Sequence, residues 1–352
     1  MFVSASSAAA QTPPYGRTVI VPATGNASIN GAALISALAS LSPSPGSGTR
    51  WLIKLDAGVY DVGTTPVVMR EQVDIEGSGV LMTTIRGSVA PALGSLVGGL
   101  VEGASQAELR SLTVACNSDA TTTGCQGISI VDAHPRLTDL RILVQGTGTS
   151  GHWGIRTFNS RPVLDRVEIQ VSTSTSGESY GIVYGGSSKM DIARSSILVR
   201  NASGNNWGVV FKESLEASEM RDSSVIGIGG TSAAGIMHLQ SFTDQTIVFD
   251  NVQVTSHGGT VSTGIGADSG DGGKIFFRGG RISGATHGVN LFATNFFLSN
   301  SEVSGTSILV FANKVRLGSS WLRGGGSISA LTSAVCAGVH NDAFTFFPNT
   351  CP

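Results

Sequence analysis

The chain has 352 residues and a formal net charge of -2; only 13% of its residues are charged, and 47 are glycine. This composition is typical of an all-β protein with many tight turns and argues against a helical enzyme. A near-neutral charge provides no basic stripe to neutralise phosphates, so nucleic-acid binding is disfavoured. No apolar run is long enough to span a bilayer, so membrane insertion is not expected.

The first segment, residues 1–16, contains a small-residue stretch at Ala8–Ala10 that is typical of a signal-peptide cleavage region. It lacks a positive n-region and a full apolar h-region. We interpret the segment as the remnant of a leader or as a disordered tail. Residues 17–352 are then expected to form a single domain, because no linker interrupts them.

A short helix is predicted near the N-terminus over Gly31–Leu41. Apolar residues there recur at helical spacing, and the pattern stops before Pro43. A helix in this position would cover the first layer of a repeating fold, whose end otherwise exposes core and strand edges.

The middle of the chain repeats. The pair Gly-(Ile/Val) recurs at intervals of 27, 27, 27, 27, 29 and 24 residues, at Gly127, Gly154, Gly181, Gly208, Gly235, Gly264 and Gly288. A second apolar column has a similar period: Ile142, Ile169, Ile197, Val225, Val254, Ile282, Val303 and Leu322. Each repeat holds short alternating strands separated by Gly, Ser and Asn. The pattern predicts a parallel β-helix, a solenoid in which residues 153–181 form one coil.

Four cysteines form two sequence-local pairs, Cys116 with Cys125 and Cys336 with Cys351. Neither spacing matches a zinc site, so two disulfides and an oxidising compartment are predicted. We therefore expect the protein to be secreted or displayed at the cell surface. The segment after Ser327 is mostly non-periodic, and a disulfide-closed cap is expected there.

The opening strands resemble a known superfamily. WLIKLDAGVY at 51–60 is followed by VDIEGSG at 73–79 and TTIRG at 83–87. These segments resemble the first coils of the pectin lyase-like superfamily, and the later repeats, with SRPVLD at 160–165, resemble bacterial secreted β-helix proteins without an assigned role. The resemblance covers nearly the whole chain and implies a right-handed, single-stranded parallel β-helix. It does not imply an activity, because that superfamily includes lyases, hydrolases, esterases and non-catalytic adhesins.

Three aromatic residues precede the repeated Gly in successive coils: Trp153, Tyr180 and Trp207. Spaced about 4.8 Å apart, they would form a row whose ring faces suit the binding of an extended polysaccharide. In a straight strand, however, Trp153 shares its face with Ile155 and would point into the core. Only a positive φ or a bulge at the Gly would break this parity.

Most charges on the repeats are expected to form structural ladders. Arg141 and Glu168 occupy equivalent positions in adjacent coils, as do Arg281 and Glu302, and are predicted cross-strand pairs of opposite sign. A second ladder, of alternating charges and turn amides, lies three positions before the apolar column: Asp139, Arg166, Arg194, Asp222, Asn251 and Asn300.

The candidate catalytic residues are Asp268 and Asp271, with His257 about one strand away. Paired carboxylates can act as acid and base in glycoside hydrolysis or bind calcium, although Gly-Asp-Ser sequences are also ordinary turn chemistry. No pectinesterase-like, pectate lyase-like or polygalacturonase-like motif accompanies them. No resident cofactor or metal is expected, apart from calcium if the protein is a lyase.

The sequence therefore favours a secreted, non-catalytic binding or surface-structural protein with an extended polysaccharide as ligand. The alternative is a carbohydrate-active enzyme, either a polysaccharide lyase or a glycoside hydrolase, of the pectin lyase-like superfamily. The sequence leaves the oligomeric state open.

Overall fold

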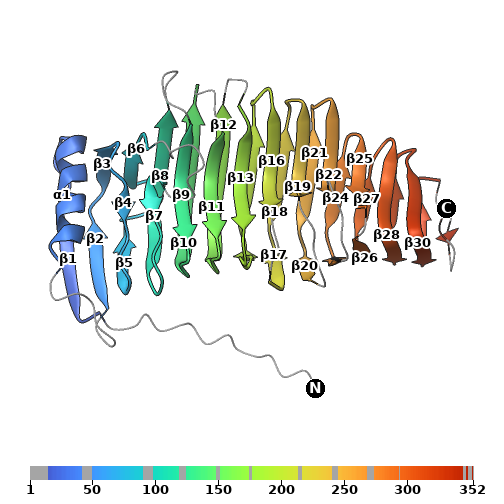
Figure 1. Ribbon diagram of the computed structural model, residues 1–352, viewed down its shortest axis with the longest axis horizontal. Coiled ribbons are helices and arrows are strands. Elements are labelled where there is room, and N and C mark those ends of the chain that lie inside the picture. Colours follow the sequence, from blue (N-terminus) through green and yellow to red (C-terminus); the bar gives the residue numbers. More distant parts are fainter. Residues whose placement is uncertain are drawn as a thin grey trace.

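The computed structural model describes residues 15–41, 50–89, 98–118, 124–147, 151–173, 177–212, 216–239, 245–267, 273–292, 294–343, 346–347 and 351. These residues form one long stack of coils, with helix α1 (Ala27–Ala39) at one end and strand β30 (Ser327–Ala337) near the other (Figure 1). Each strand of a coil pairs in parallel with the equivalent strand of the next. The predicted all-β parallel solenoid is confirmed.

Each coil contributes strands to three sheets. Sheet 1 contains β4 (Val67–Val68), β7 (Val101–Glu102), β9 (Cys125–Val131), β11 (His152–Phe158), β13 (Ser179–Gly185), β16 (Asn205–Phe211), β19 (Ser232–His238), β22 (Val261–Ala267), β25 (His287–Asn290) and the first parts of β28 (Ile308–Gly318) and β30. Its strands lie side by side along the stack, in the order of the chain.

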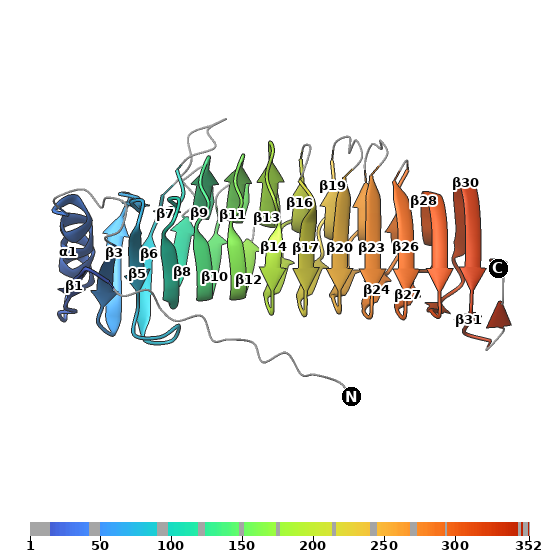
Figure 2. The same ribbon diagram turned by 90° about the horizontal axis from the view of Figure 1, so that it is seen from below.

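Sheet 2 begins at the N-terminal end of the stack. It contains β1 (Arg17–Val21), β2 (Trp51–Leu55), β5 (Val73–Glu76), the first parts of β8 (Glu108–Ser118), β10 (Arg136–Gly146) and β12 (Val163–Thr173), then β14 (Asp191–Ala193), β17 (Ser218–Arg221), β20 (Thr246–Asp250), β23 (Lys274–Arg278), β26 (Asn295–Ser299) and the ends of β28 and β30. Figure 2 shows β14, β17, β20, β23 and β26 side by side.

Sheet 3 completes the coils. It contains β3 (Gly58–Gly63), β6 (Thr83–Gly87), the ends of β8, β10 and β12, then β15 (Ser196–Arg200), β18 (Ser224–Ile228), β21 (Gln253–His257), β24 (Arg281–Gly284), β27 (Glu302–Ser304), β29 (Trp321–Arg323) and β31 (Val339–Asn341). The short β32 (Phe346–Phe347) pairs with β31 in the antiparallel sense.

The apolar column predicted from the sequence forms an internal ladder of sheet 3. From Ile142 to Leu322 its members are in register, each stacked on its counterpart in the next coil. Every member is at most 1% exposed. One coil alone could not bury these side chains, so the coils depend on their neighbours for stability.

The turn between sheets 2 and 3 explains the second predicted ladder. Its six members, Asp139, Arg166, Arg194, Asp222, Asn251 and Asn300, have φ between 48° and 54°, in the left-handed region. One such residue redirects the chain between the two sheets. Asn and Asp tolerate this conformation best, and an ordinary side chain pays roughly 1–2 kcal/mol for it. The ladder is therefore a feature of the turn, as predicted.

Serine hydroxyls follow the left-handed residue and connect successive turns. Ser195 Oγ accepts a hydrogen bond from the Val167 amide at 3.1 Å, and Ser223 Oγ accepts one from the Ser195 amide at 3.1 Å. Buried amides at a sheet corner have no strand partner, so these hydroxyls supply the acceptors that the corner requires.

Helix α1 confirms the predicted N-terminal cap, with different bounds. It begins four residues earlier than expected because the Asn26 side chain accepts hydrogen bonds from the amides of Ser28 and Ile29. Leu34 and Leu38 are buried against the first coils. With 13 residues, α1 is also too short to cross a bilayer, as is every helix of the described residues.

The start of the chain is described only in part. Of the proposed leader or tail, residues 1–16, the first 14 lie outside the described residues. Tyr15 and Gly16 already contact the fold, because the Tyr15 hydroxyl donates to Asp74 at 2.6 Å and the Gly16 amide donates to Arg50.

The C-terminal end has the predicted disulfide closure, but the segment that it closes is more regular than expected. The chain after Ser327 forms one more regular coil, because β30 pairs with β28 and β31 pairs with β29. Its Ser- and Ala-rich sequence hides the strand periodicity. Both predicted disulfides are present, Cys116–Cys125 and Cys336–Cys351, and the second closes the chain onto the last coil.

An internal aromatic stack runs beneath sheet 1. Tyr184, Phe211 and His238 occupy equivalent positions, with ring centroids 5.6 Å and 6.4 Å apart. His238 is only 3% exposed, and burial lowers its pKa to about 3. The folded protein therefore keeps this imidazole neutral over the pH range in which the unfolded chain becomes protonated.

This burial predicts a loss of stability in acid. As the pH falls below about 6.5, His238 binds a proton in the unfolded chain but not in the folded protein. This difference lowers the free energy of unfolding by roughly 3 kcal/mol at pH 4. His238→Phe should continue the stack and remove this share of the acid sensitivity. Urea unfolding at pH 7 and pH 4 measures it, and equal pH dependence in both proteins would contradict the prediction.

Candidate functional site

The predicted aromatic row exists on sheet 1. Trp153, Tyr180 and Trp207 are in register on β11, β13 and β16. The first two rings stack with centroids 6.1 Å apart at 14°, while Tyr180 and Trp207 meet edge to face at 5.6 Å. The rings therefore contact one another along the stack axis.

The row lies outside the coil interior, because the inward–outward alternation of each strand breaks at its glycine. Ile182 belongs to the main core, whereas Tyr180, two residues before it, belongs to a second apolar cluster. A Cβ on Gly181 would lie 2.3 Å from Ile197 Cγ2, so this glycine also faces inward. Two consecutive inward residues break the strand parity, without a left-handed φ at the glycine. The parity therefore breaks with neither the positive φ nor the register-shifting bulge that was expected, because all three strands share the irregularity and pair one to one on either side of it.

The row is nevertheless largely covered. Tyr180 is 3% and Trp207 is 7% exposed, and both pack against Val183, Val210 and the rest of the second cluster. Trp153 is half-buried, and the guanidinium of Arg156 lies 5.5 Å from its ring centroid. Trp153 is therefore the member of the row whose ring is partly accessible to a ligand. A sugar-binding role for the row stays a prediction.

The two tryptophans should respond differently to truncation. Trp207→Ala should cost about 3–5 kcal/mol of unfolding free energy, because the ring is buried in the second cluster. Trp153→Ala should cost about 1 kcal/mol. Chemical denaturation measures both, and equal small losses would show that the row is not a packing element.

The inward-facing glycine of each coil gives a second stability prediction. A Cβ on Gly208 would lie 2.2 Å from Val225 Cγ1 and 2.6 Å from the Gly235 oxygen, so Gly208→Ala should destabilise by about 1–3 kcal/mol. Gly325→Ala is the control, because nothing lies within 4 Å of its added Cβ. The prediction fails if the two variants unfold at the same denaturant concentration.

The predicted catalytic residues are only partly placed. Asp268 and Asp271 lie outside the described residues. His257 is exposed at the end of β21 in sheet 3, whereas β22, which ends at Ala267 just before Asp268, lies in sheet 1. Within the described ranges, no group of three or more His, Cys, Asp or Glu side chains could hold a metal ion. The acid–base hypothesis, including calcium, stays a prediction.

A small hollow lies on sheet 1 beside the end of β22. It encloses about 280 Å³ and is lined by Met237, Thr263, His287 and Asn290 among others. Thr263 Oγ1 lies 3.4 Å from His287 Nδ1, and burial lowers the pKa of His287. Sequence reasoning did not select His287, because no motif surrounds it.

A longer groove follows the corner between sheets 2 and 3; we call it the corner groove. Two hollows, of about 470 Å³ and 800 Å³, share Asn251 and Gln253 and so adjoin one another. The left-handed turn position of eight successive coils lines them: Arg166, Arg194, Asp222, Asn251, Gly279, Asn300, Ser319 and Gly338.

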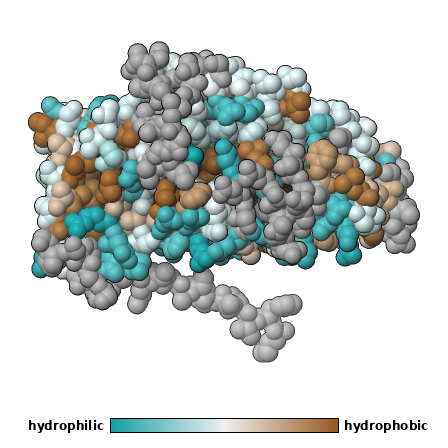
Figure 3. Space-filling model, viewed as in Figure 1, coloured by the Kyte–Doolittle hydropathy of each residue, from teal (hydrophilic) through white to brown (hydrophobic). Residues whose placement is uncertain are grey.

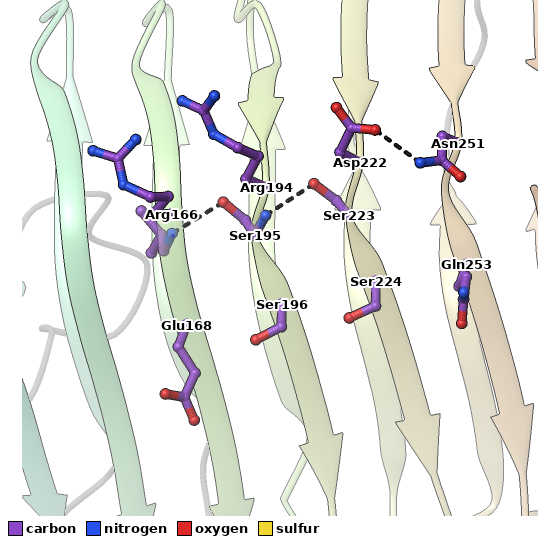
Figure 4. A pocket seen from close by; sticks show the side chains of 11 residues that line it. Arg166, Glu168, Arg194, Ser195, Ser196, Asp222, Ser223, Ser224, Asn251 and Gln253 are labelled. Carbon is purple, nitrogen blue, oxygen red and sulfur yellow. Dashed lines mark hydrogen bonds between the residues drawn. The ribbon is translucent and has the colours of Figure 1, made fainter.

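A second row of the groove comes from the first outward residue of each sheet 3 strand. Its members are in register: Glu168, Ser196, Ser224, Gln253, Arg281, Glu302, Trp321 and His340. Figure 4 shows the first four of them on neighbouring strands, with Asp222 and Asn251 joined by a hydrogen bond above them. The strand-to-strand pairing makes the groove parallel to the stack axis.

Most charges that line the corner groove are paired within the protein. Arg194 Nη2 lies 2.6 Å from Asp165 Oδ1, and Arg281 Nη2 lies 3.3 Å from Glu302 Oε1. Glu168 Oε2 lies 3.4 Å from Arg141 Nε. The two predicted cross-strand pairs, Arg141–Glu168 and Arg281–Glu302, are therefore confirmed.

The first coil of the groove is neutralised in the same way. Arg166 Nη2 donates to Asp139 at 2.9 Å. This hydrogen bond holds the pKa of Asp139 below its usual value. The groove therefore presents hydroxyls, amides and paired charges, which can exchange hydrogen bonds with sugar hydroxyls. The sequence predicted the turn ladder and the two charged pairs, but neither the complete second row nor the hollow.

Comparison with known proteins supports the fold. The chain matches no protein-family profile, and no curated protein sequence matches it. Among solved structures it is similar to the pectate lyase Pel9A, with a TM-score of 0.53 at 12% identity over 93% of this chain and 80% of that one.

Two further similarities are weaker. The catalytic domain of a GH87 α-1,3-glucanase in complex with nigerose gives a TM-score of 0.47 at 14% identity, covering 93% of this chain and 67% of that one. The A-module of the Azotobacter vinelandii mannuronan C-5 epimerase AlgE6 gives 0.34 at 13% identity, covering 89% and 95%. At such identities the likeness shows the fold alone, and the parallel β-helix that the resemblance implied is the fold found.

Proposed function

We propose that the protein is a secreted or cell-surface polysaccharide-binding protein that holds an extended glycan along the corner groove without cleaving it. The carrying observation is the continuity of the groove, which is lined by eight successive coils and has Asn251 and Gln253 common to both hollows. At about 4.8 Å per coil, the seven steps span about 34 Å. This length accommodates several sugar units of a linear chain.

The chemistry of the lining supports this proposal. Ser196, Ser224 and Gln253 present hydroxyl and amide groups on adjacent strands, and each can donate and accept. The strands that carry them are fixed by parallel pairing on both sides. A ligand would therefore meet a preorganised row of polar groups, which lowers the entropic cost of binding.

The apolar residues of the surface support a glycan site outside the corner groove less well than the polar lining supports the groove itself. On the face seen in Figure 3, hydrophobic residues gather near the end that carries α1 and in smaller patches along the stack. The aromatic row of sheet 1 is mostly buried. Of its three members, Trp153 remains the candidate for an additional contact.

The alternative function is a carbohydrate-active enzyme. It rests on Asp268, Asp271 and His257, and the hollow that contains His287 beside the end of β22 is the observation that favours it. The similarity to a protein named as a pectate lyase fits a polysaccharide-related role of either kind. A lyase would be expected to require calcium.

Affinity electrophoresis in plant, algal and bacterial polysaccharides, with and without calcium, tests the proposal. Gln253→Ala removes an exposed side chain from the middle of the groove and should weaken retention about 5- to 10-fold, the value of one hydrogen bond. Gln145→Ala, which removes an exposed Gln away from the groove, is the matched control and should bind normally.

Three outcomes are informative. Retention that Gln253→Ala weakens and Gln145→Ala does not would support the corner groove. Release of reducing ends or unsaturated products in the same samples would favour the enzyme. Failure of the protein to bind any polysaccharide in the panel would reject the proposal.

A further inference from the structure

The charges that line the corner groove balance one another. The lining contains three guanidinium groups, from Arg166, Arg194 and Arg281, and three carboxylates, from Glu168, Asp222 and Glu302. Their sum is zero. The lining of the groove therefore carries no net charge of either sign.

Each of these guanidinium groups already faces an internal carboxylate. Arg166 pairs with Asp139, Arg194 with Asp165, and Arg281 with Glu302. An acidic sugar that bound one of them would have to displace the internal carboxylate, exchanging one ion pair for another. Such an exchange gains little, because exposed ion pairs are weak and their desolvation offsets the attraction.

Glu302 has the largest effect on this balance. Its Oε1 lies 3.3 Å from Arg281 Nη2 and 3.2 Å from Arg323 Nε, so one carboxylate pairs with two cations, from the coils before and after its own. Trp321, which pairs with Glu302 in the register, has its ring 5.9 Å from the guanidinium of Arg323 and stacked on His340. This end of the groove therefore combines an aromatic ring with arginine side chains that are paired to a carboxylate.

We infer that the corner groove is selective for a neutral polysaccharide, and that Glu302 is the specificity-determining residue that excludes uronate chains. This inference rests on the proposed function of the groove. Glu302 acts in two ways: it occupies Arg281 and Arg323, and its own charge repels an incoming carboxylate. Uncharged sugar hydroxyls are unaffected by either effect.

Glu302→Gln tests the inference by removing the carboxylate with little change in volume. The variant should gain at least about 5-fold affinity for polygalacturonate at about 20 mM salt and lose that gain at about 300 mM, because the exposed cations are screened. Neutral glucans, arabinans and xylans should show no such salt-dependent gain, because they carry no charge for the released arginines to attract. Isothermal titration calorimetry or affinity electrophoresis measures both.

Glu219→Gln is the matched control, because Glu219 is a half-buried acid on sheet 2 whose Oε1 lies 3.8 Å from Arg221 Nη1 and which does not line the groove. It makes the same change of net charge and should gain no uronate binding. Thermal unfolding of both variants verifies that they fold.

The outcomes separate the inference from the function on which it rests. Wild-type protein that binds polygalacturonate more tightly than neutral glycans, with a steep salt dependence, would overturn neutral selectivity while leaving the groove as a glycan site. The role of Glu302 would be overturned if the protein bound neutral glycans but Glu302→Gln gained no affinity for polygalacturonate. An equal gain in Glu219→Gln would overturn it as well. Absence of binding to every polysaccharide would reject the groove itself.

Discussion

The structure depends on the stacking of each residue on its counterpart in the next coil. Parallel pairing holds equivalent positions at one strand spacing, so any residue type that recurs in the sequence becomes a continuous ladder in space. An apolar position becomes a strip of core, as from Ile142 to Leu322. A polar position becomes a row of hydrogen-bonding groups on the surface.

The same constraint explains why local strain is tolerated in this chain. Arg166 and Arg194 adopt a left-handed φ that arginine ordinarily avoids, and each recovers an ion pair with an aspartate of the preceding coil. The following serines then satisfy amides at the corner, as Ser195 does for Val167. A single isolated turn of this kind would be unfavourable. It is stable here because every coil repeats the turn and its side chains support the turn of the neighbouring coil.

A surface made of ladders is suited to a ligand that is itself a repeating chain. The corner groove arises because the left-handed turn redirects the chain between sheets 2 and 3 in coil after coil, which leaves a hollow parallel to the axis. Its selectivity then follows from pairing within the ladders. Where an acid stacks beside an arginine, as Glu302 does beside Arg281, the pair leaves little charge for a ligand.

The sequence by itself determined the repeat, the parallel β-helix, both disulfides and the charged pairs, because all of these follow from spacing along the chain. It could not decide the direction of Trp153, Tyr180 and Trp207, since the alternation of each strand breaks at its glycine and nothing in the local sequence signals this break. It also missed the last coil after Ser327, where small residues conceal the strand pattern. The corner groove was decided by tertiary structure alone, because a hollow is a relation between two sheets and no linear pattern encodes their angle.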